Sequence, residues 1–312
     1  MIVDAHQHFW DPARAEYPWM TDEVALLRRR FGPDHLEPLL REHGVTGTVV
    51  VQARQSLDET RDLLAIAAST ESVLGVVGWV ELKADVPEQL AEFEGTPLVG
   101  IRHLVHDEPD PEWLLRDDVQ RGIAGVGEAG LVYDLLVRTR ELPAAIETAR
   151  RHGGTRFVLD HVAKPPADPG EYRMWQRGVA ALAELSNVAC KISGLFTETD
   201  PTRTAARALR WFGPERCMWG SDWPVTLLAS GYGDGLALAG DDPRVLAGTA
   251  VAIYRLQVTQ ASISDQSSSG TGTSSSRASS SISSGDRAPT TTDTTAGWRS
   301  GNCSAAAGSG TS

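Results

Sequence analysis

Residues 2–10 read Ile2-Val3-Asp4-Ala5-His6-Gln7-His8-Phe9-Trp10, a short apolar and β-branched run that passes into polar residues. Runs of this kind are typical of strands in a parallel sheet, which are buried on both faces. The first strand is therefore expected at Ile2–Ala5. Seven further runs of the same character predict the remaining strands: Thr48–Gln52, Leu74–Val80, Leu98–Val105, Leu131–Val137, Phe157–Leu159, Val188–Ile192 and Cys217–Gly220.

Helical patterns follow these runs along the chain. They are found at His35–His43, Leu57–Ser69, Val86–Phe93, Pro111–Val126, Leu142–His152, Glu171–Leu185, Thr202–Phe212 and Pro243–Leu256. Eight strands, each followed by a helix, over about 250 residues predict an α/β fold, a (β/α)8 barrel of the TIM type. An open, doubly wound sheet is the alternative. It is weakened because no G-x-G-x-x-G sequence follows the first strand.

The composition of the chain changes sharply near Val258. About half of residues 259–312 are Ser or Thr, and large apolar side chains are rare there. Such a segment cannot bury enough apolar surface to offset the entropy lost on ordering. We therefore expect a barrel domain over residues 1–258 and a disordered, low-complexity C-terminal tail over 259–312.

Composition also restricts the class of protein. The chain has 312 residues and a formal net charge of −12, which disfavours a nucleic-acid partner. No run approaches the roughly 20 apolar residues that span a bilayer, and the N-terminus lacks a signal-peptide pattern. Three cysteines cannot form a disulfide framework. We expect a cytoplasmic protein with no membrane partner, and the oligomeric state stays open, a homo-oligomer included.

Polar residues follow several predicted strands at the ends where a barrel carries its chemistry. His6 and His8 are two residues apart, so in extended chain they point to the same side and could hold one ion. The alternative is a polar pair at a strand exit. His161 follows the run 157–159, and Asp222 follows the last run as a ligand, a general base or both. Together these four residues predict a site for a single divalent ion or for acid–base chemistry.

Six stretches, in order along residues 1–258, carry a resemblance to a known family: Val3–Pro12, Gly100–His103, Gly130–Leu135, Leu159–Pro165, Cys190–Leu195 and Gly220–Val225. In them the chain resembles the amidohydrolase superfamily, in particular its sugar-lactone hydrolases of the fuconolactonase and rhamnonolactonase type. The resemblance implies a barrel whose metal ligands are His6, His8, His161 and Asp222. Many relatives hold two metals through a carboxylated lysine on the fourth strand, and the run 98–105 contains no lysine. We therefore expect one divalent ion, zinc or similar, with a metal-free site as the alternative.

Other polar residues near strand ends could contact substrate or take part in catalysis. Arg102 and His103 alternate in orientation, so at most one should face the interior; His103 is favoured as a carbonyl or hydroxyl contact, with Arg102 close behind as an anion anchor. His106, in the loop beyond, is expected at the surface. Lys191 is expected to contact substrate or to form a structural ion pair, and Asp134 to pair with Lys191 or to hold a sugar hydroxyl.

Aromatic residues complete the set of candidates. Tyr133 is a candidate substrate contact beside Asp134, and Trp10 and Trp223 could stack on a sugar face or serve packing.

The expected function is hydrolysis of a sugar-derived lactone, an aldonolactone. Asp222 would take a proton from the attacking water, metal-activated or not, and return it to the leaving ring oxygen. Lys191 or His103 would help to hold the oxyanion. A metal-dependent decarboxylase of the same superfamily and a non-catalytic barrel are the alternatives. Sequence alone does not identify the sugar.

Overall fold

The computed structural model describes residues 1–258, and the tail predicted for 259–312 lies outside the described residues. Eight parallel strands pair in chain order, from β1 to β8, in one curled sheet. Their bounds are β1 (Val3–Gln7), β2 (Gly47–Val51), β3 (Val73–Gly78), β4 (Leu98–His103), β5 (Val132–Leu135), β6 (Arg156–Leu159), β7 (Val188–Ile192) and β8 (Cys217–Trp219). The predicted (β/α)8 barrel is confirmed.

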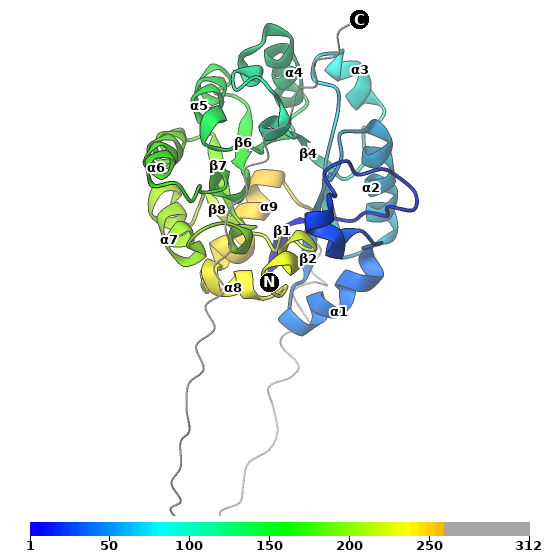
Figure 1. The fold of residues 1–312 in the computed structure, drawn as a ribbon. Helices are drawn as coiled ribbons and strands as arrows, with labels where there is room; N and C mark the ends of the chain where they lie inside the picture. The colour runs from blue at the N-terminus through cyan, green and yellow to red at the C-terminus, as the bar shows by residue number, and fades with distance from the viewer. Residues whose placement is uncertain (259–312) are drawn as a thin grey trace, which may run out of the picture. The chain divides into compact units, whose positions relative to one another are not determined.

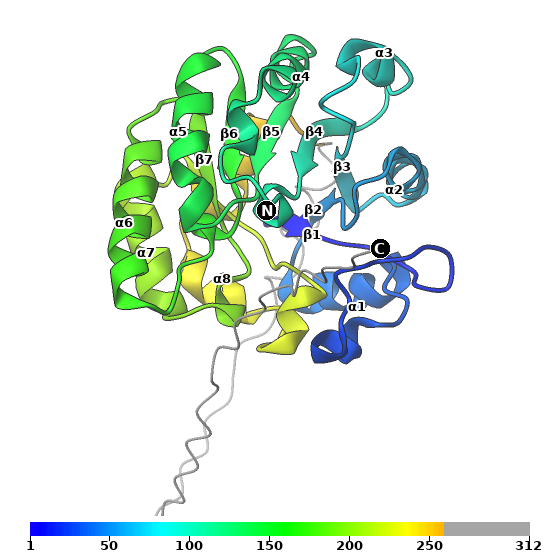
Figure 2. The same cartoon turned by 45° about the horizontal axis from the view of Figure 1, so that its top comes forward.

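Helices form the outer ring around these strands, as Figures 1 and 2 show. They are α1 (Pro33–His43), α2 (Leu57–Ser69), α3 (Val86–Ala91), α4 (Asp117–Glu128), α5 (Leu142–Arg151), α6 (Pro169–Ala183), α7 (Pro201–Phe212) and α8 (Asp234–Ala239). A further helix, α9 (Thr249–Tyr254), packs against the inward-facing residues of the strands. Among residues 1–258 no helix has the length and apolar character needed to cross a membrane.

Two helices depart from the prediction. The helix expected from Pro111 begins only at Asp117, because residues 113–115 form a separate 3-10 turn in which the Trp113 ring stacks on His103 at 4.1 Å between centroids. Tertiary packing therefore overrides the helical pattern there. Helix α8 was not predicted, since the surrounding segment 231–240 is rich in glycine, which is unfavourable in helices.

The barrel closes between β1 and the residues that follow β8, through backbone hydrogen bonds and a buried carboxylate. His8 N donates to the Trp223 carbonyl at 2.7 Å, and Asp222 N donates to the His6 carbonyl at 2.8 Å. Below them, the buried Asp4 carboxylate accepts hydrogen bonds from the Ser221 hydroxyl at 2.6 Å and from the Ser221 amide at 2.8 Å. Burial raises the pKa of Asp4 to about 6 against the lowering effect of these hydrogen bonds.

The interior of the barrel is apolar at one end and charged at the other. Inward-facing side chains at the N-terminal ends of the strands form one cluster with residues of α9 and the π-helical turn Arg244–Gly248. In Figure 1, α9 lies across the centre of the ring. Its Tyr254 hydroxyl donates to the Asp134 carboxylate at 2.8 Å, which marks the boundary with the charged layer. The apolar end is therefore sealed, and the opposite end remains for chemistry.

Candidate active site

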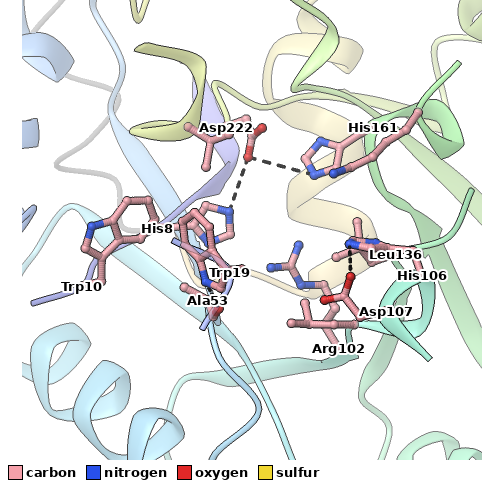
Figure 3. Close-up of a pocket in the computed structure, with 13 residues that line it drawn as sticks. His8, Trp10, Trp19, Ala53, Arg102, His106, Asp107, Leu136, His161 and Asp222 are labelled. Carbon is pink, nitrogen blue, oxygen red and sulfur yellow. Dashed lines mark hydrogen bonds and ion pairs between the residues drawn. The ribbon is translucent and has the colours of Figure 1, made fainter. Parts of the chain in front are cut away.

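A cavity of about 190 Å³ opens at the C-terminal ends of the strands (Figure 3). Its walls combine polar side chains that follow β1, β4, β6 and β8 with aromatic and aliphatic residues of the loops. The lining residues are His8, Trp10, Trp19, Ala53, Arg102, Leu104, His106, Asp107, Leu136, His161, Lys164, Asp222 and Val225. The pocket thus lies where a (β/α)8 barrel presents its functional residues.

Three imidazoles and one carboxylate converge at the floor of this pocket. His6 Nε2 lies 3.2 Å from His8 Nε2, and Asp222 Oδ1 lies 3.7 Å from His6 Nε2 and 3.4 Å from His8 Nε2. His161 Nε2 is 4.0 Å from the same oxygen of Asp222 (Figure 3). These four are the residues predicted as metal ligands, and the structure brings all four together.

The second nitrogen of each imidazole is engaged away from this point. His8 Nδ1 lies 2.7 Å from the Val51 carbonyl, so it carries the proton and leaves Nε2 free of one. His161 Nδ1 is 2.9 Å from the Ser193 hydroxyl, and His6 Nδ1 is 3.4 Å from Asp160 Oδ1. The contacts of His8 and His161 are hydrogen bonds of the kind that orients histidines bound to a metal, whereas His6 Nδ1 faces the Asp160 carboxylate without a hydrogen bond.

Burial keeps the imidazoles neutral. It lowers the pKa of His8, lowers that of His6 well below its usual value, and lowers that of His161 to about 4. Burial opposes ionisation of Asp222, but the neighbouring imidazoles hold the pKa of this carboxyl below its ordinary range. The Nε2 atoms of His6 and His8 lie 3.2 Å apart beside the carboxylate, and Arg102 Nη1 lies 3.3 Å from His6 Nε2, which accepts its hydrogen bond when no ion is bound. A divalent cation fits this donor set.

The backbone on the far side of the cluster approaches it too closely for a side chain. A Cβ on Gly194 would lie 2.6 Å from Asp222 Oδ2 and 2.7 Å from His161 Nδ1. Gly194 also has φ of +61°, which favours glycine. The glycine of the loop after β7 therefore leaves the space that the carboxylate and the imidazole occupy.

A strained turn carries His161 into the pocket. His161, Val162, Ala163 and Lys164 have successive φ values of 52°, 51°, 56° and 47°. A left-handed conformation costs roughly 1–2 kcal/mol for each residue that is not glycine. The surrounding structure holds the turn, since Trp175 Nε1 donates to the Val162 carbonyl at 2.8 Å. Strain of this kind concentrates at functional sites.

Beneath the imidazoles lies a buried layer of paired charges. Arg102 donates to Asp160 Oδ2 at 2.9 Å and to the Gln52 carbonyl at 2.5 Å. Lys191 Nζ is 2.6 Å from Asp134 Oδ2 and 3.1 Å from Asp160 Oδ1, with no exposed side-chain surface. Because Asp160 is already neutralised by two cations, the group of His6, His8 and Asp222 is the better cation site than the group of His6, Asp160 and His161.

The structure places other predicted residues apart from the cavity. On β4 it is Arg102, and not His103, that faces the interior; His103 accepts from Trp79 Nε1 at 3.2 Å and lies 2.7 Å from Glu108 Oε1. Lys191 and Asp134 pair with each other beneath the pocket. Lys191 and Asp134 therefore form the structural ion pair, one of the two alternatives predicted for them, and do not contact the cavity.

The aromatic candidates divide in the same way. Trp10 lines the pocket, and its indole N–H donates to the Leu27 carbonyl at 3.0 Å. Trp223 is 2 % exposed and packs at right angles on Phe31 at 5.3 Å. Tyr133 is fully buried among the outward-facing residues of the sheet. Trp223 and Tyr133 are therefore not brought to the cavity.

The structure also corrects one expectation and adds residues to the site. His106 was expected at the surface, yet it lines the pocket with its side chain 16 % exposed, because the 3-10 turn at residues 105–107 folds it back. Trp19, Asp107 and Lys164 line the pocket and were not predicted. Trp19 comes from the loop before α1 and donates to the Ala53 carbonyl at 2.8 Å. No periodicity in the sequence signals such a loop contact.

Comparison with known proteins agrees with this geometry. The family model described as amidohydrolase matches residues 3–256. The chain belongs to the amidohydrolase family. Two curated relatives are L-fucono-1,5-lactonases: that of Burkholderia ambifaria is 41 % identical over 241 residues, covering 74 % of this chain and 83 % of that protein. That of Burkholderia multivorans is 39 % identical over 249 residues, covering 74 % and 84 %.

Solved structures extend this amidohydrolase relationship to three dimensions. A crystal structure of an amidohydrolase from Burkholderia multivorans with bound zinc is 36 % identical, with a TM-score of 0.78, and covers 82 % of this chain and 100 % of that one. A 2,6-dihydroxybenzoate decarboxylase structure shares the fold at 13 % identity and a TM-score of 0.58. The predicted family is confirmed, and the decarboxylase is the more distant of these two.

Proposed function

We propose that this amidohydrolase opens an aldonolactone, with L-fucono-1,5-lactone as the first substrate to test. The prediction of a lactone-hydrolysing enzyme is confirmed by the family match and by the two fuconolactonase relatives. The observation that carries the proposal is the convergence of His6, His8, His161 and Asp222 on one point of a pocket at the ends of the strands. The pocket also offers indole rings, which suit the apolar face of a sugar.

The four convergent residues are proposed to hold one divalent ion, zinc first. A zinc ion bound there supplies Lewis acidity, which polarises an ester carbonyl and makes a water more acidic. His8 and His161 present Nε2 because Val51 and Ser193 engage their other nitrogens. Arg102 occupies the interior position on β4, where it lies 3.3 Å from His6 Nε2.

Asp222 is proposed as the base and then the acid of the reaction. Its ionised carboxylate accepts the proton of the attacking water as the oxygen bonds to the lactone carbonyl carbon. The ring C–O bond then breaks, and the same carboxyl returns the proton to the leaving ring oxygen, which becomes a hydroxyl group. Such proton transfers contribute typically 10²–10⁴-fold to the rate.

The upper walls of the pocket are proposed to bind the sugar ring. Trp10 and Trp19 meet edge to face with centroids 5.2 Å apart, and both indole N–H groups are engaged by backbone carbonyls. The rings are therefore fixed before a ligand enters, which lowers the entropy lost on binding. Leu104 and Leu136 also line the pocket and help to exclude water around the ester.

The test is a pH-indicator assay of ring opening on five- and six-membered aldonolactones, before and after chelation, with zinc content measured in parallel. Asp222→Asn is expected to keep the unfolding transition and to lose at least 10²-fold in kcat. Asp58→Asn, at an exposed carboxylate on α2, should retain activity. An Asp222→Asn variant with full activity would overturn the role of this residue. No turnover of any lactone by a metal-loaded chain would move the proposal to the decarboxylase reading.

A further inference from the structure

Lys164 is a cation of the pocket that neither the sequence-based prediction nor the proposed reaction has used. It lines the cavity together with His161 and Asp222, and its side chain is largely buried. Within residues 1–258 its Nζ atom has no hydrogen-bond or ion-pair partner, whereas Arg102 is paired with Asp160 at 2.9 Å. Lys164 therefore has three donor positions available for a ligand.

The backbone explains why Lys164 reaches the pocket. Residues 160–163 form a tight 3-10 turn with left-handed φ values that continue to Lys164. In a turn of three residues, positions i and i+3 lie on the same side. His161 and Lys164 stand in this relation, and both line the cavity. The turn, closed by the hydrogen bond from Lys164 N to the His161 carbonyl at 2.9 Å, thus brings an imidazole and an ammonium to the same cavity.

The carboxylates of Asp107, Glu198 and Asp222 interact electrostatically with Lys164, but none of them lies within ion-pair distance of its Nζ atom. Burial lowers the pKa of its ammonium, Arg138 and Arg102 act in the same direction, and Glu198 and Asp222 oppose them. Glu198 is itself 4.0 Å from Arg138 Nη1, and Asp222 belongs to the imidazole cluster. Removing an ammonium partly from water, close to other cations, costs free energy unless a ligand accepts its hydrogen bonds.

Lactone hydrolysis creates the group that would satisfy this ammonium. The ester carbonyl oxygen gains negative charge when water adds to the carbonyl carbon, and the ring-opened product is a carboxylate at neutral pH. A charged donor in a water-poor pocket stabilises both species more than it stabilises the neutral lactone. The lysine predicted for this task, Lys191, is fully buried and held between Asp134 and Asp160.

We infer that Lys164 is a catalytic residue of the proposed lactone hydrolysis: its ammonium binds the carbonyl oxygen as the oxyanion forms and then the carboxylate of the opened acid. The inference rests on the proposed function and adds the group that receives the negative charge. It predicts a pocket that binds an aldonate more tightly than the uncharged alditol of the same sugar.

The experiment compares wild-type protein with Lys164→Met, which keeps the length of the side chain without the charge, and with Lys164→Arg. Turnover of L-fucono-1,5-lactone and inhibition by L-fuconate and L-fucitol are measured on samples of equal metal content. Lys164→Met should lose about 10²–10³-fold in kcat with KM changed far less, and inhibition by L-fuconate should weaken at least tenfold. Inhibition by L-fucitol should not change, and Lys164→Arg should recover part of kcat.

The control is Lys83→Met, at an exposed lysine that does not line the pocket, which should behave as wild type. Unchanged inhibition by L-fucitol shows that the pocket of each variant is formed. A Lys164→Met variant with wild-type kcat and wild-type inhibition by L-fuconate would overturn the inference while leaving the lactonase intact. Failure of the wild-type chain to open any aldonolactone would instead overturn the proposed function itself.

Discussion

At the scale of single residues, Glu59 on α2 offers a clear electrostatic test. Its side chain is 3 % exposed, and Oε2 accepts hydrogen bonds from the backbone amides of Ala53 and Arg54 at 3.0 and 2.8 Å. Burial nevertheless raises its pKa to about 7 from 4.5. The unfolded chain therefore releases this proton at a lower pH than the native protein does. Between pH 4.5 and about 7 the native state binds more protons than the unfolded state. Stability from this group is complete below pH 4.5 and is lost as the pH rises toward 7.

Glu59→Gln removes that dependence, because the amide oxygen can still accept both hydrogen bonds and no charge is buried. The free energy of unfolding of the variant, minus that of wild type, should increase by about 1–3 kcal/mol between pH 4.5 and 7. Above pH 7 this difference should stay constant. Urea denaturation at pH 5, 6, 7 and 8 measures this difference. Glu71→Gln, at an exposed carboxylate, should show no such slope. A constant difference between Glu59→Gln and wild type would contradict the buried charge.

Individual site residues were predictable where strand geometry decides their position. His6, His8, His161 and Asp222 directly follow apolar runs, and parallel strands bring such positions to one end of a barrel. The choice between Arg102 and His103 depends on the phase of β4 relative to its neighbours, which the apolar run alone does not specify. Lys164 depends on a left-handed turn in a sequence without glycine, for which local propensity gives no signal.

At the scale of elements, α4 shows how closely the outer ring packs against a loop. A Cβ on Gly122 would lie 2.2 Å from the Leu82 carbonyl oxygen and 2.9 Å from the Leu82 carbonyl carbon. These are backbone atoms, so the helix or the loop before α3 must move. Gly122→Ala should therefore destabilise the protein by about 1–3 kcal/mol, even though alanine favours a helix by about 1 kcal/mol.

Gly125→Ala on the same helix is the matched control. Its added Cβ would meet side-chain atoms of Val86 and Pro87 at 3.3 Å, which can yield more easily than a backbone carbonyl. The two substitutions add the same methyl group and the same helix propensity. Thermal or urea unfolding should show the larger loss for Gly122→Ala, and equal stability of the two variants would contradict the close approach of α4 to Leu82.

Most of the strands and helices were predictable from the sequence. All eight strands were predicted, since each is a short apolar run bounded by polar residues, and most helices have an amphipathic pattern. The segment 11–32 was not assigned, because it contains only a 3-10 turn and contacts that depend on the rest of the molecule. Trp19 belongs to this segment, so of the two indoles proposed to bind the sugar only Trp10, which directly follows the first strand, was predicted.

At the scale of residues 1–258, stability and chemistry lie at opposite ends of the barrel. One end is closed by α9 and its apolar neighbours, and the other carries the convergent imidazoles. The paired charges of Arg102, Asp160, Lys191 and Asp134 lie between them. A layer of this kind fixes the interior side chains, since removing one partner of a buried pair is strongly destabilising. The floor of the pocket is therefore rigid, while its walls come from loops.

This organisation predicts that a chain ending at Val258 is sufficient for folding and catalysis. Every strand that the structure describes, every residue that lines the pocket and the whole family match at residues 3–256 lie within it. The shortened chain should unfold at the same temperature as the full chain and open aldonolactones with the same kcat/KM. Calorimetry and the indicator assay on the two proteins, side by side, measure both quantities. Aggregation or a severalfold loss of activity in the shortened chain would show that residues 259–312 contribute to the enzyme.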